Sequence, residues 1–68
     1  MSYVDRMIEE RNELETKITA LNNFIRENDT FSYAEKDEQM RMIQQLGFMT
    51  SYHNILEFRI LNAGKGQA

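Results

Sequence analysis

Apolar side chains recur at steps of three and four residues over the stretch 40–60, which is the pattern of one face of an α-helix. The positions on this face are Met42, Leu46, Met49, Tyr52, Ile55, Leu56 and Ile60. Ile43, Phe48 and Leu61 widen the apolar arc beyond the width that a single partner helix covers. The pattern therefore predicts a long helix with more than one neighbour.

A second apolar pattern begins near the N-terminus and repeats every seven residues. Its two series are Val4, Arg11, Ile18 and Ile25, in which Arg11 is a polar break, and Met7, Leu14 and Leu21. Heptad spacing predicts a helix that packs along its length against another helix. Ser2 and Asp5 have the spacing of a capping box, so this helix is expected to begin at about Tyr3.

Small polar residues between the two patterns predict a short connector. They form one cluster, residues 27–30, in which Asn28 is expected to end the first helix in the left-handed conformation. Residues 32–35, Ser-Tyr-Ala-Glu, match a second capping box and place the start of the second helix near Tyr33. A short connector makes the helices antiparallel. The expected fold class is all-α, an antiparallel helical hairpin of two long helices.

The second helix is expected to run from Tyr33 to Asn62, and a separate turn or a bend stays open at residues 36–39, which include no apolar side chain. This gives a single helical domain over residues 1–62 and a flexible C-terminal tail over residues 63–68. Gly47 lies within the apolar part of this helix, where glycine costs about 1 kcal/mol relative to alanine. A kink in the helix and a close approach of another helix each explain a glycine at this position, and both remain open.

Length and composition favour an assembly of several chains. A domain of this size buries only about 60% of its unfolded surface, and the 68-residue chain contains no cysteine. Neither a disulfide nor a thiolate metal site can therefore stabilise it. Oligomerisation is the remaining source of stability, and we expect a symmetric homo-oligomer.

Charge and hydropathy exclude two classes of partner. The net charge of −3 is spread along the chain without a basic block, which disfavours binding to long nucleic acids. The apolar runs are far shorter than the roughly 20 residues of a membrane span, and the N-terminus lacks the pattern of a signal peptide. We therefore expect no membrane partner and a cytoplasmic location.

Few side chains point to catalysis or metal binding. His53 is the only histidine, and Glu57 is the only acid one helical turn away from it. This falls short of the ligand sets that zinc requires, so neither a metal site nor a cofactor is expected. No serine has a histidine and an acid in a recognisable relation to it, and there is no glycine-rich phosphate loop. The chain is not expected to be an enzyme.

Two arginines, Arg11 and Arg59, lie at or beside the apolar seams. A cation in such a place pairs with an acid, reaches out to solvent, or binds an anion. A structural role is favoured, either pairing with an acid such as Glu15 or Glu57 or specifying the register of the helices, and anion binding is the alternative.

One edge of the first helix carries an aromatic residue and a cation. Tyr3 and Lys17 share this edge and lie about 21 Å apart along the helix axis. They cannot meet within one chain, but a two-fold axis between chains would bring two tyrosines and two lysines around one site. Such a site fits a ligand with two bases and two phosphates.

The order of these residues resembles the phage anti-CBASS family, small proteins that act as sponges for cyclic oligonucleotide second messengers. The resemblance covers most of the chain, from Tyr3 to Ile60, and consists of common helical residues at fixed spacings. The positions that carry it are Tyr3, Arg6, Met7, Glu10, Leu14, Lys17, Ile18, Thr19, Leu21, Phe24, Ile25, Phe31, Leu46, Met49, Tyr52, Ile55, Leu56, Arg59 and Ile60.

The resemblance implies a helical protomer in a symmetric hexamer that binds cyclic dinucleotides or trinucleotides, such as cyclic GMP-AMP, without cleaving them. It implies that Tyr3 stacks on a base, that Lys17 contacts a phosphate and that Thr19 supplies a nearby hydroxyl. Arg59 would serve a separate site for cyclic trinucleotides. The implied function is a sponge that inhibits CBASS antiphage signalling in the host cytoplasm. The alternative is a small oligomeric coiled-coil adaptor or inhibitor that binds another protein.

Overall fold

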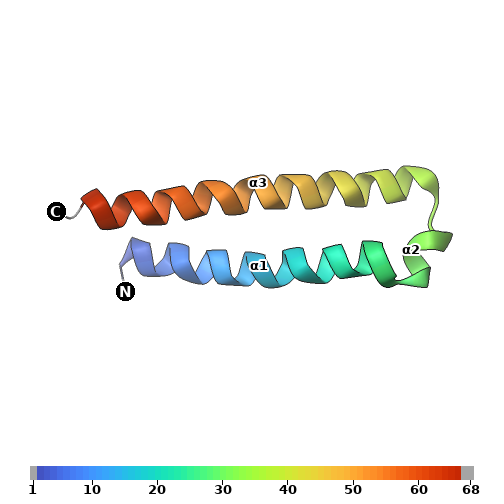
Figure 1. Ribbon diagram of the computed structural model, residues 1–68, viewed down its shortest axis with the longest axis horizontal. Helices are drawn as coiled ribbons and strands as arrows, with labels where there is room; N and C mark the ends of the chain where they lie inside the picture. Colours follow the sequence, from blue (N-terminus) through green and yellow to red (C-terminus); the bar gives the residue numbers. More distant parts are fainter. Residues whose placement is uncertain (1, 67–68) are drawn as a thin grey trace.

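The computed structural model describes residues 2–66 and contains two long helices joined by a short one (Figure 1). Helix α1 spans Tyr3–Glu27, α2 spans Asp29–Tyr33 and α3 spans Lys36–Gly66. The two long helices lie side by side and antiparallel, and α2 forms the turn at one end. The molecule measures 52 × 16 × 15 Å. The prediction of an all-α antiparallel hairpin is confirmed.

The start of α1 is determined by local capping, as predicted. The Ser2 hydroxyl accepts a hydrogen bond from the backbone N–H of Asp5 at 3.1 Å, and the Asp5 carboxylate accepts one from the backbone N–H of Ser2 at 3.4 Å. These reciprocal bonds satisfy backbone donors that the first helical turn leaves unpaired. The Asp5 charge also lies near the positive end of the helix dipole.

The connector differs from the prediction in two respects. Asn28 has φ −94° and ψ 127°, which is extended rather than left-handed. It caps the following helix instead, because its side chain accepts a hydrogen bond from the N–H of Thr30 at 2.8 Å. Ser32 lies inside α2, so the second capping-box match does not start a helix, and α3 begins at Lys36 after an extended Ala34.

Contacts between α2 and its neighbours hold this turn. The side-chain amide of Gln39 donates to the backbone carbonyl of Phe31 at 2.8 Å and to that of Ser32 at 3.3 Å. The rings of Phe24 and Phe31 meet edge to face with their centroids 6.4 Å apart, which is a favourable aromatic geometry. The connector is thus tied to both long helices.

The core is a narrow seam between α1 and α3. Its buried side chains are Met7, Leu14 and Leu56, and Leu56 is only 1% exposed. The partly buried side chains packed against them are Val4, Ile18, Met49, Ile60 and Ala63. The α1 members of this seam belong to the predicted heptads, which confirms that the heptad face packs against the second long helix.

The apolar arc of α3 is wider than the face that α1 covers. Several large apolar side chains of α3 therefore remain exposed, namely Met40, Ile43, Phe48, Tyr52, Ile55, Phe58 and Leu61. Exposed apolar surface on this scale is typical of an interaction surface. The prediction that this helix has more than one neighbour is consistent with this exposure, and the homo-oligomer stays a prediction.

Helix α3 passes through Gly47 without a break and ends at Gly66, beyond the end expected at Asn62 (Figure 1). A Cβ atom added at Gly47 would meet nothing within 4 Å. Within the chain, then, no close approach of another helix accounts for this glycine. Residues 67–68 of the predicted tail lie outside the described residues, and the division into a domain and a flexible tail stays a prediction.

Replacing Gly47 with alanine is expected to stabilise the protein by about 0.5–1 kcal/mol. Glycine in the middle of a helix loses more backbone entropy on folding than alanine does, and the added methyl group has free space. Thermal unfolding followed by circular dichroism would measure the gain. A loss of stability instead would mean that another chain packs closely against Gly47.

Candidate ligand-binding face

An ion pair between the long helices shows which of their edges adjoin. The guanidinium of Arg11 donates from Nη1 to Glu57 Oε1 at 2.9 Å, and its Nε lies 3.5 Å from Glu15 Oε1. On the same edge, His53 Nε2 lies 3.4 Å from Glu15 Oε1. The predicted pairing of Arg11 with an acid is confirmed, and it involves both of the acids named from the sequence.

The other edge of the hairpin carries the residues predicted to bind ligand. Residues seven apart drift only about 20° around a helix, so Tyr3 and Lys17 stay on one edge of α1. Because the helices are antiparallel, this edge lies on the same face as the α3 edge that contains Tyr52 and Arg59. Counting along both helices from the contact between Glu15 and His53 puts Lys17 level with the turn of α3 that includes Tyr52.

Both predicted phosphate-binding cations are available for a ligand. Lys17 and Arg59 are exposed, and neither takes part in an ion pair within residues 2–66. The expectation that Arg59 pairs with an acid is therefore wrong for the described part of the chain. Glu57, which was one of the candidate partners, is taken by Arg11. Tyr3 is 57% exposed, so much of its side chain is accessible to a stacking partner.

Thr19 does not share a face with Lys17. Two residues along a helix are separated by a rotation of about 200°, so their side chains point in nearly opposite directions. Thr19 instead lines a shallow hollow of about 440 Å³ together with Glu15, Thr16 and Ala20. A single chain does not bring Tyr3, Lys17 and Thr19 together, so a common site for all three requires more than one chain.

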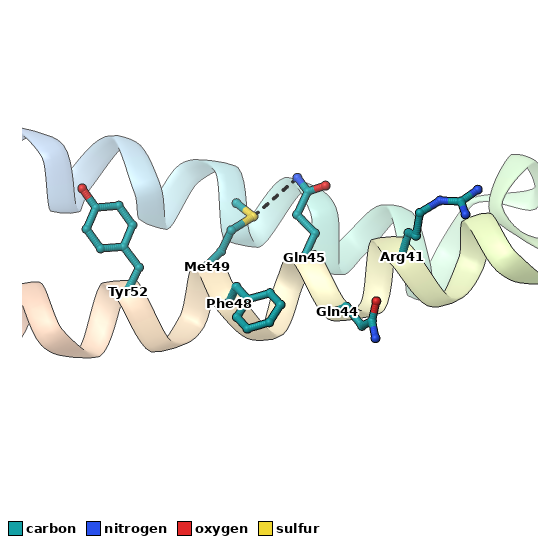
Figure 2. Close-up of a pocket in the computed structure, with 6 residues that line it drawn as sticks. All are labelled: Arg41, Gln44, Gln45, Phe48, Met49 and Tyr52. Carbon is teal, nitrogen blue, oxygen red and sulfur yellow. Dashed lines mark hydrogen bonds between the residues drawn. The ribbon is translucent and has the colours of Figure 1, made fainter.

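A hollow along α3 was not identified from the sequence as a site (Figure 2). Its volume is about 560 Å³, and it is lined by Arg41, Gln44, Gln45, Phe48, Met49 and Tyr52. Figure 2 shows the Tyr52 hydroxyl directed toward the α1 side and the Arg41 guanidinium at the far end of the hollow. The Gln45 amide lies 3.8 Å from the Met49 sulfur. Aromatic surface beside amide and guanidinium donors suits a planar ligand with hydrogen-bonding edges.

Two further series of residues seven apart on α3 could have indicated this hollow from the sequence. Arg41, Phe48 and Ile55 are seven residues apart, and so are Gln45, Tyr52 and Arg59. These series flank the core face of α3 rather than form it. They place the hollow on the same edge as Arg59, and therefore on the face that carries Tyr3 and Lys17.

The described part of the chain is a helical hairpin with a narrow core, an exposed apolar surface and, on one face, two cations without an ion-pair partner among residues 2–66. This is the architecture of a small binding protein. None of the helices within residues 2–66 has an apolar stretch that could cross a membrane. The Sequestin family model matches residues 1–62. The chain belongs to this family, the phage anti-CBASS sponges for cyclic oligonucleotides, which confirms the resemblance seen in its sequence.

Comparisons with curated proteins and with solved structures each gave no significant match. Membership of a family named for sequestration favours binding over catalysis.

Proposed function

We propose that this protein is a non-catalytic sponge that binds cyclic dinucleotides or trinucleotides, such as cyclic GMP-AMP, and so inhibits CBASS signalling in the host cytoplasm. Membership of the Sequestin family carries the proposal. Lys17 and Arg59, which are exposed and have no ion-pair partner within the described residues, support it, because they offer positive charge on one face of a chain whose net charge is −3. An acidic protein with two local cations favours a small cyclic anion over a long polyanion.

In the proposed dinucleotide site, Tyr3 of one chain lies beside Lys17 of the partner subunit across a two-fold axis. The tyrosine ring stacks on a base, which contributes about 1–3 kcal/mol per base. The lysine donates a charge-assisted hydrogen bond to a phosphate. The axis supplies each contact twice, in keeping with a ligand of two bases and two phosphates, and Thr19 enters from another chain because it faces away from Lys17.

Arg59 belongs to a second proposed site, for cyclic trinucleotides. It lies on α3 rather than α1 and is exposed and unpaired among the described residues. Around a three-fold axis, one guanidinium from each of three chains would meet one phosphate each, and guanidinium groups bind phosphate oxygens in a bidentate manner. The two sites would then be separable by mutation.

Both sites need a homo-oligomer, for which a hexamer is the proposed state. The apolar residues of α3 that a single chain leaves in solvent support this assembly, with Phe48 and Phe58 exposed by 76% and 66%. Burying such side chains against other copies of the chain stabilises the assembly by about 25 cal/mol for each Å² of apolar surface removed from water.

The same exposed surface also supports a second candidate, a small oligomeric coiled-coil adaptor or inhibitor that binds another protein. The apolar hollow lined by Phe48, Met49 and Tyr52 would receive side chains of that partner. An adaptor of this kind gains no stability from cyclic nucleotides, which separates the two candidates.

The sponge proposal is tested by thermal unfolding of the purified chain with cyclic GMP-AMP, a cyclic trinucleotide, and a linear dinucleotide as control. A ligand at one hundred times its Kd adds about 2.7 kcal/mol to the folded state, so an increase in Tm of roughly 10 °C or more is expected for a domain of this size. The released nucleotide should be chemically intact. No Tm shift with any cyclic nucleotide, or recovery of a cleaved product, would contradict the proposal.

A further inference from the structure

A histidine and two glutamates meet on the edge of the hairpin that faces away from Lys17. Glu15 projects from α1, and His53 and Glu57 project from α3 one turn apart. One potential ligand atom from each residue lies within 4.8 Å of the other two. The proposed nucleotide sites use none of these residues.

The His53 nitrogen that faces this cluster is unsatisfied. Nε2 is buried and has no hydrogen-bond partner among residues 2–66, although it lies 3.4 Å from Glu15 Oε1. The nitrogen therefore lies close to two carboxylates without a hydrogen bond to either of them. A buried polar atom without a partner is unfavourable, and a metal ion is one species that neutral imidazole and carboxylates bind together.

We propose that Glu15, His53 and Glu57 bind one divalent transition-metal ion, with Zn²⁺ as the best fit. Zinc bonds of about 2.0–2.2 Å to nitrogen and oxygen place tetrahedral ligand atoms roughly 3.3–3.5 Å apart. The separation of 3.4 Å between His53 and Glu15 already has this value. The imidazole ligand selects against Mg²⁺ and Ca²⁺, which prefer oxygen ligands throughout. Three protein ligands leave the fourth position for water.

Arg11 is the competitor for this site. Its guanidinium now bonds Glu57 and approaches Glu15, so it neutralises the two carboxylates that the metal needs. Arg11 also donates to the side-chain oxygen of Asn12 from Nε and Nη2, at 3.2 and 3.1 Å. Because the guanidinium is planar, these bonds are made in the same position as the contacts with the carboxylates, so Arg11 must move before a metal ion can bind. Metal binding is therefore an exchange in which Zn²⁺ replaces a cation already present.

The bound metal would link the two long helices. Glu15 lies on α1 and the other two ligands on α3, so the complete site forms only in the folded hairpin. Binding to the folded state alone raises the free energy of unfolding.

The experiment uses the full chain without a histidine tag. Thermal unfolding is recorded with ZnCl₂, with MgCl₂ and with EDTA, and zinc affinity is measured by competition with a chromophoric chelator. Zn²⁺ is expected to bind with one ion per chain and to raise the Tm, whereas Mg²⁺ leaves the Tm at its EDTA value. No zinc binding, or an equal effect of Mg²⁺, overturns the proposal.

Three variants locate the site. His53→Gln and Glu57→Gln each remove a ligand and should weaken zinc binding at least about tenfold, while Arg11→Gln removes the competitor and should strengthen it. Glu13→Gln is the matched control, because Glu13 is an exposed acid of α1 outside the cluster. Equal zinc affinity in the wild type and both ligand variants, with folding verified by circular dichroism, would refute the site. Weaker binding by Arg11→Gln would refute the exchange.

Discussion

Replacing Lys17 with alanine is expected to reduce the affinity for cyclic dinucleotides by about 100-fold or more. A hydrogen bond to a charged group contributes about 1.5–3 kcal/mol. Because the proposed two-fold axis places two copies of Lys17 at each site, the substitution removes two such bonds at once. The Tm without ligand should stay unchanged, because Lys17 is exposed and has no ion-pair partner in residues 2–66. Isothermal titration calorimetry with cyclic GMP-AMP measures the loss.

Two further variants make this result specific. Lys36→Ala is the matched control, since Lys36 is an exposed lysine at the start of α3, away from the proposed site, and it should bind as the wild type does. Arg59→Ala should bind cyclic trinucleotides more weakly and cyclic dinucleotides with wild-type affinity, whereas Lys17→Ala should show the reverse. Wild-type dinucleotide affinity in Lys17→Ala would show that the site lies elsewhere, with the hollow around Tyr52 as the next place to test.

Replacing Leu56 with alanine is expected to destabilise the fold by about 2–5 kcal/mol, the range for leucine in a well-packed core. Leu56 is 1% exposed and lies with Met7 and Leu14 in the seam between α1 and α3. The free energy of unfolding of a small domain is low, so this variant should be largely unfolded near 37 °C. Chemical denaturation followed by circular dichroism gives the difference in unfolding free energy.

The same substitution at Leu61 is the control for Leu56. Leu61 is on the same helix but 58% exposed, so the single hairpin loses little when it is truncated. If Leu61 is buried between chains, the loss of unfolding free energy caused by Leu61→Ala will depend on protein concentration, because subunit binding and folding are linked. Equal, concentration-independent losses at both positions would contradict the assignment of the core seam.

Local hydrogen bonding explains which parts of the fold could be predicted from the sequence. The start of α1 was predicted because Ser2 and Asp5 satisfy each other within one turn. The start of α3 differs from the predicted start near Tyr33, because Asn28 caps an additional short helix, α2, that includes Ser32 and Tyr33. That turn is then held by Gln39, whose bond to Phe31 spans eight residues. A pairing of this kind is not visible in a local motif.

The relative placement of the helices explains what was missed at the candidate sites. The edge shared by Tyr3 and Lys17 follows from helical periodicity alone. The cluster around His53 does not, because only the i, i+4 pair with Glu57 can be read from the chain. Its third member, Glu15, comes from the other helix. Likewise, the wide apolar arc of α3 did not reveal that α1 covers Leu56 and leaves Ile55 58% exposed.

Native mass spectrometry of the purified chain, alone and with a panel of cyclic dinucleotides and trinucleotides, tests the sponge most directly. We expect a closed oligomer, proposed to be a hexamer, that gains a whole number of intact ligand masses no greater than its number of subunits. The number bound also reports the site symmetry, because two chains would share each dinucleotide and three would share each trinucleotide in the proposed sites. An oligomer that gains no nucleotide mass would contradict the sponge, and a monomer would contradict the shared sites as well.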